Sequence, residues 1–126
     1  MPSRSIAKHA WSTELAGFSE QHEGWLVSIR RYSPDGETVV EAHDVPLEGI
    51  SSTSHGGSDI AVEVGRDESH LTHRIHDAIA MRIELTADHA ARALVVDARD
   101  GSTTSIEFRS PTRAEEVDGR PMSQAR

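Results

Sequence analysis

The sequence predicts a single, mainly β domain, built as a small antiparallel six-stranded barrel or two-layer sandwich with one N-terminal α-helix. The length of 126 residues fits one domain. After Gly24, apolar residues recur at every second position, which is the period of a half-buried strand. Clusters of Gly, Pro, Asp and Ser divide these runs into short strands. A flat sheet would leave its apolar face uncovered, so closure or packing of sheet on sheet is expected.

One helix is predicted near residues 13–22. Leu15, Phe18 and His22 are spaced i, i+3 and i+7, so they share one helical face. Gly24 then supplies the left-handed conformation that commonly ends a helix. A helix this short is not stable alone in water. We therefore expect its apolar face to cover an open end of the strands.

Three strands are predicted in the first half of the chain, at 25–32, 38–52 and 60–64. The Ser-Pro-Asp-Gly segment at 33–36 predicts the turn between the first two. Pro46 lies inside the second run and has no backbone N–H to donate. The strand must therefore bend, bulge or lie at an edge there.

Three more strands are predicted after a polar connection at 66–77, which leaves room for one short extended piece. The clearest alternation in the chain is at 79–86, and a further strand is centred on 94–96. Asp100-Gly101 predicts a hairpin that leads into the last strand, 105–109.

The ends of the chain lack this pattern. Residues 1–10 are expected to be a flexible N-terminus, residues 11–111 the domain, and residues 112–126 a disordered tail, since the tail is almost without apolar residues.

Composition excludes several classes of function. The chain has no cysteine, so disulfides, thiolate nucleophiles and Cys-ligated zinc are impossible. Its net charge of −8 disfavours nucleic acid as a partner. No apolar run is long enough to span a membrane, and no secretory signal opens the chain, so we expect a cytoplasmic protein with no membrane partner. Phosphate-binding and dinucleotide-binding glycine motifs are absent, and no cofactor is expected.

A histidine-rich segment is the sharpest candidate site. His70, His73, His76 and Asp77 have the side chains that bind zinc or nickel. On a helix the three histidines would span about 9 Å of rise, and on a strand His73 would face away from the other two. Neither geometry brings all three to one ion. The alternative is that they cap backbone groups where the two halves of the domain meet.

No catalytic residues are predicted. The His-Gly-Gly-Ser segment at 55–58 is similar to an esterase oxyanion loop, but the matching Gly-x-Ser-x-Gly motif is absent. A turn explains its glycines. Candidate interaction residues are Arg30 and Tyr32, a basic residue and an aromatic close together, and Pro46 and Leu47 at the expected bend.

The chain also resembles a family of small bacterial proteins catalogued only as a domain of unknown function. The resemblance covers roughly residues 11–111. Its most characteristic pieces are the Pro-Leu-x-Gly-Ile motif at 46–50 and the His-Leu-x-His motif at 70–73. The other matching pieces are Glu23-Gly24-Trp25, Glu41-Ala42, Val45, Asp97, Asp100-Gly101 and Phe108-Arg109-Ser110-Pro111. This resemblance implies no activity, cofactor or substrate, and it supports the predicted fold.

Three kinds of function therefore remain open. The first is a non-catalytic interaction or accessory module that binds a protein partner or assembles with itself. The second is a metal-binding protein or metal-dependent enzyme that uses His70, His73, His76 and Asp77. The third is a hydrolase with an unrecognised set of Ser and His residues.

Overall fold

Eight antiparallel strands and one α-helix make up the part of the chain that the computed structural model describes, residues 3–52, 58–65 and 70–109. The elements in chain order are β1 (Ser3–Ser5), the short 3₁₀ helix η1 (Lys8–Ala10), α1 (Trp11–His22), β2 (Leu26–Tyr32), β3 (Thr38–Ser52), β4 (Ile60–Val64), β5 (Leu71–Ile75), β6 (Ala78–Leu85), β7 (Ala91–Ala98) and β8 (Thr103–Phe108).

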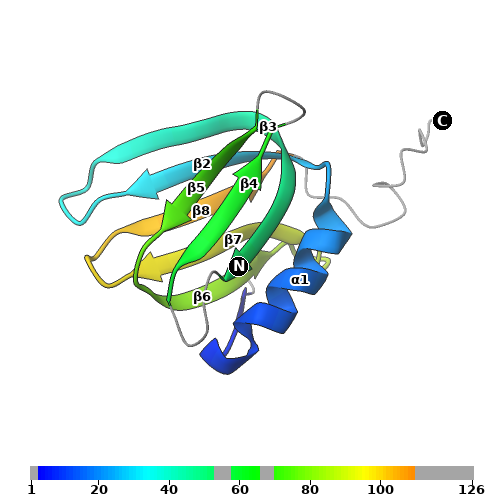
Figure 1. Ribbon diagram of the computed structural model, residues 1–126, viewed down its shortest axis with the longest axis horizontal. Helices are drawn as coiled ribbons and strands as arrows, with labels where there is room; N and C mark the ends of the chain where they lie inside the picture. The colour runs from blue at the N-terminus through cyan, green and yellow to red at the C-terminus, as the bar shows by residue number, and fades with distance from the viewer. Residues whose placement is uncertain (1–2, 53–57, 66–69, 110–126) are drawn as a thin grey trace.

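The strands form one sheet in the order β1-β6-β7-β8-β2-β3-β4-β5. The first half of β3 pairs with β2 and its second half pairs with β4, so this long strand belongs to both layers of a folded sheet. Figure 1 shows β4 and β5 in front of the layer formed by β2, β8, β7 and β6. The sheet is open, because β1 and β5 end it without pairing to each other. The mainly β class with one N-terminal helix is confirmed. The described residues form eight strands where six were expected, and the sheet does not close into a barrel.

The two additional strands come from polar sequence. β1 has no apolar residue, yet Arg4 lies opposite Ile83 on β6. Directly after it, Ile6 is buried and its N–H donates to the carbonyl of Met81. Residues 3–5 are thus part of the sheet and Ile6 is part of the core, whereas no strand was expected within residues 1–10. Residues 112–126 lie outside the described part of the chain.

The bend at Pro46 is present, and β3 crosses between the layers there. Asp44, just before it, has a positive φ of 51°, and the β2–β3 register shifts on both sides of Ile29. The backbone continues to pair through the bend, since Leu47 donates to the carbonyl of Trp25. The missing donor of proline therefore bends the strand without ending it.

Helix α1 closes the core beside the second half of β3. Its buried side chains are Trp11, Leu15, Phe18 and His22, the face that the sequence predicts with one aromatic added. Ser19 joins the helix to β3, because its hydroxyl accepts a hydrogen bond from the N–H of Ile50 and donates one to the carbonyl of the same residue. Figure 1 shows the helix along one side of the two layers, as expected for an element that covers an open end.

Candidate functional site

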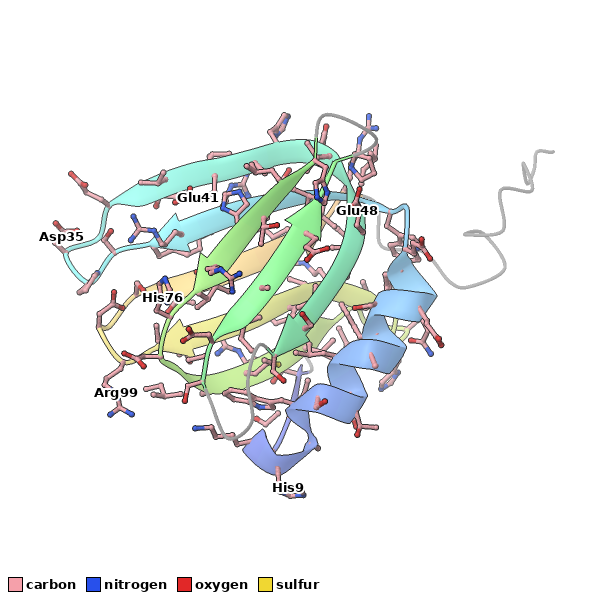
Figure 2. All side chains as sticks on the ribbon, in the orientation of Figure 1. His9, Asp35, Glu41, Glu48, His76 and Arg99 are labelled. Atoms are coloured by element: carbon pink, nitrogen blue, oxygen red, sulfur yellow. The ribbon has the colours of Figure 1, made fainter. Side chains whose placement is uncertain are left out.

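The histidine-rich segment forms β5 and the turn that follows it. Each histidine faces a carboxylate from another part of the chain. Two of these carboxylates, Glu41 and Glu48, lie at separate places along β3 (Figure 2). The Nδ1–oxygen distances are 2.8 Å for His70 to Glu48, 3.9 Å for His73 to Glu41 and 3.4 Å for His76 to Asp59. Within residues 3–52, 58–65 and 70–109, no three His, Cys, Asp or Glu side chains lie close enough to hold a metal ion. The four residues considered as metal ligands are therefore not brought together.

Asp77 has a structural position at the corner between β5 and β6. Its φ is 54°, in the left-handed region that favours glycine, and its N–H donates to Asp59. Its carbonyl accepts a hydrogen bond from the N–H of Arg99, in the β7–β8 turn. These backbone contacts are made by Asp77, whereas the alternative interpretation expected the histidines to cap backbone groups, and the histidines face carboxylates instead.

Strand β5 is an edge of the sheet. It pairs with β4 through five consecutive residues without a register shift, and nothing in the described residues pairs with its other side. His73 lies opposite Val62, which is buried, so His73, Leu71 and Ile75 share the inward face. Thr72 and Arg74 share the outward face. Leu71 is 50% exposed, because no strand lies beside it on the open side.

The layer beneath this edge is also partly open. On the β2–β3 hairpin, Arg31 and Val39 lie opposite each other, and Val39 is 39% exposed. Arg31 forms an ion pair with Glu41, whose other oxygen faces His73. The Nε2 atom of His73 is buried and has no hydrogen-bond partner among the described residues. The site is thus a sheet edge beside a small polar cluster, with apolar side chains exposed on both layers.

The residues expected at an interaction surface are divided by the fold. Arg30 lies on the outer face of the larger layer and forms an ion pair with Glu107. Tyr32 is 37% exposed at the end of β2. Leu47 packs in the core at 1% exposure, so it is removed from the expected surface, and Pro46 beside it is half-buried.

A comparison with known protein families gives one result. The sequence model of DUF5335, a family of unknown function, matches residues 2–117. The chain belongs to this family. The resemblance to a domain of unknown function is thereby confirmed. No curated protein and no solved structure matches the chain. In the described part of this DUF5335 domain, no helix has the length and hydropathy needed to cross a membrane.

A histidine on α1 of the DUF5335 domain, His22, is buried away from the β5 edge. The ring of His22 stacks on Phe108 at 4.8 Å and meets Trp25 edge-on at 4.6 Å, between centroids. Its Nδ1–H donates to the carbonyl of Phe18, which fixes the tautomer. Burial lowers the pKa of His22 from the ordinary value of 6.5, and the hydrogen bond to Phe18 opposes this in part.

We expect the DUF5335 domain to lose stability in mild acid because of His22. A histidine with a lowered pKa binds a proton less readily when folded than when unfolded. The contribution of neutral His22 to the free energy of unfolding is therefore fully present above about pH 6.5. It falls as the pH decreases toward the lowered pKa, by at most ~1.4 kcal/mol per pH unit. Urea unfolding at pH 7.5, 6.5 and 5.5 measures this. His22→Phe should flatten the dependence over this range, and an unchanged slope in that variant would assign the acid sensitivity to other groups.

Proposed function

We propose that this DUF5335 domain is a non-catalytic interaction module that binds an extended segment of a partner protein as an additional strand beside β5. The observation that carries the proposal is the free edge itself. β5 pairs without a shift on one side only and has half-exposed Leu71 on its inward face. Unpaired N–H and C=O groups on such an edge are a template for another strand.

The contrast with the other end strand supports this assignment. β1 is three residues long and has no apolar side chain. Short, polar edge strands are a common protection against unwanted pairing, as are prolines and bulges. Within β5 the edge has neither a proline nor a bulge. Its one inward polar residue, His73, lies over the Arg31–Glu41 ion pair.

The hairpin beneath the edge supports the same mode of binding. An added strand would lie over the inner face of the β2–β3 hairpin, where Val39 is exposed and Arg31 is half-buried. Strand addition would bury these side chains together with Leu71, and burial of apolar area stabilises a complex by roughly 25 cal/mol per Å². The cytoplasmic location and the lack of a nucleic-acid partner are part of this proposal.

A charge placed on the edge should abolish partner binding without unfolding the domain. When the wild-type domain is expressed in cells and captures a partner protein, we expect the Leu71→Lys variant not to capture that partner. Ile79→Lys is the matched control, because Ile79 on β6 is 52% exposed, against 50% for Leu71. Quantitative affinity capture measures binding, and thermal melting confirms that both variants fold. Equal loss in the two variants, or none in either, would contradict the proposal.

A further inference from the structure

The chemistry of β5 indicates which kind of segment fits beside it, if the proposed strand addition is correct. We propose that the partner segment alternates apolar side chains, which face inward, with carboxylates, which face outward opposite Arg74. The inference rests on the proposed function and names the chemical class of its partner.

The inward half of this pattern follows from the pairing of β5 with β4. Leu71 lies opposite Val64 and Ile75 opposite Ile60, and both residues on β4 are buried. Directly opposed side chains in an antiparallel pair lie on the same face, about 5 Å apart. A strand on the free side would place its own inward residues beside Leu71 and Ile75. Apolar residues there would extend the two rows that already run across the sheet.

The outward half follows from charge. Arg74 is exposed and forms no ion pair with any residue that the structure describes. Glu63 lies on β4 opposite Thr72, two residues from Ala61, the residue opposite Arg74, and it forms no ion pair with Arg74. From Leu71 to Ile75 the strand has no acidic residue. An incoming carboxylate opposite Arg74 would form a cross-strand pair, whereas a lysine would be repelled.

A second copy of this chain is a poorer occupant. Its β5 would offer the same outward row of Thr72 and Arg74, so it supplies no carboxylate to the edge. In the register that places Arg74 opposite Arg74, two like charges would face each other directly, which is destabilising. A partner with acidic side chains avoids this in every register.

Titration of the isotopically labelled full chain with short capped peptides tests the inference by NMR. A peptide of alternating Glu and Val should shift the amide signals of residues 71–75 and bind about fivefold or more tightly than a peptide of alternating Lys and Val. The alternating Glu and Val peptide would contain four Glu and three Val. A control peptide of the same composition, in which the four Glu precede the three Val, should bind more weakly than the alternating peptide.

Reversal of the charge gives the decisive comparison. Arg74→Glu should reverse the preference, so that the Lys peptide binds more tightly. Arg99→Glu is the matched control, since Arg99 is exposed in the β7–β8 turn and points away from β5 (Figure 2); it should leave the preference unchanged. Equal binding of the Glu and Lys peptides at β5 would contradict the proposed preference for carboxylates, while strand addition at β5 would remain supported. No shift at residues 71–75 with any peptide would overturn the inference, and the capture experiment with Leu71→Lys would then decide the proposed function separately.

Discussion

Leu15→Ala is expected to destabilise the domain by about 2–5 kcal/mol. Leu15 is fully buried on the face of α1 that covers the core. Its truncation removes apolar contacts and leaves a cavity between α1 and the sheet that cannot easily collapse. Urea unfolding followed by tryptophan fluorescence measures the change, because Trp11 precedes Leu15 in the sequence and Trp25 follows it.

The control for this prediction lies on the opposite face of the same helix. Thr13 is exposed, so Thr13→Ala should change stability by less than about 0.5 kcal/mol. If Leu15→Ala were as mild as Thr13→Ala, the helix would not be packed on the core as the structure shows.

Ser19→Ala is expected to destabilise the domain by about 1–3 kcal/mol. The Ser19 hydroxyl accepts from the Ile50 N–H at 2.8 Å and donates to its carbonyl at 3.0 Å. Alanine leaves both backbone groups of a buried residue without these partners, in a region that water reaches poorly. The free energy of unfolding measures the loss.

A second substitution separates the hydrogen bonds from the change in volume. Ser19→Thr keeps the hydroxyl and should retain more of the stability than Ser19→Ala. Equal losses in the two variants would attribute the effect to packing near Gly49, whose missing Cβ would lie 4.0 Å from the Ser19 oxygen.

The period of the apolar residues predicts most of the fold because the buried residues follow it closely. Leu15 and Phe18 mark the covered face of α1, and Ile83 and Ile106 lie in the core as their alternation indicates. The bend of β3 could also be predicted, since Pro46 lacks a donor wherever it lies.

β5 could not be predicted as firmly, because an edge strand buries few of its side chains. Leu71 and Ile75 have the correct spacing for one face, but a histidine stands between them and polar residues surround them. The only signal in the sequence was this weak alternation, with Thr72 as a β-branched residue. The pairing of β5 with β4 depends on contacts across the sheet, which a single sequence does not record.

The histidine spacing left two interpretations open, a metal site and a set of backbone caps, and the structure gives three separate contacts with carboxylates. Spacing along the chain limits which histidines can meet each other, but it does not show which carboxylates lie across the sheet. Glu41 and Glu48 lie on β3 and Asp59 directly precedes β4, and they approach these histidines because β4 pairs with both β3 and β5.

Amide hydrogen exchange of the domain, alone and with its captured partner, tests the central claim most directly. The free edge predicts that alternate amides between Leu71 and Ile75, those that point away from β4, exchange rapidly in the isolated domain and become protected in the complex. Protection confined to α1 or to the outer face of β6, β7 and β8, with β5 unchanged, would contradict the claim.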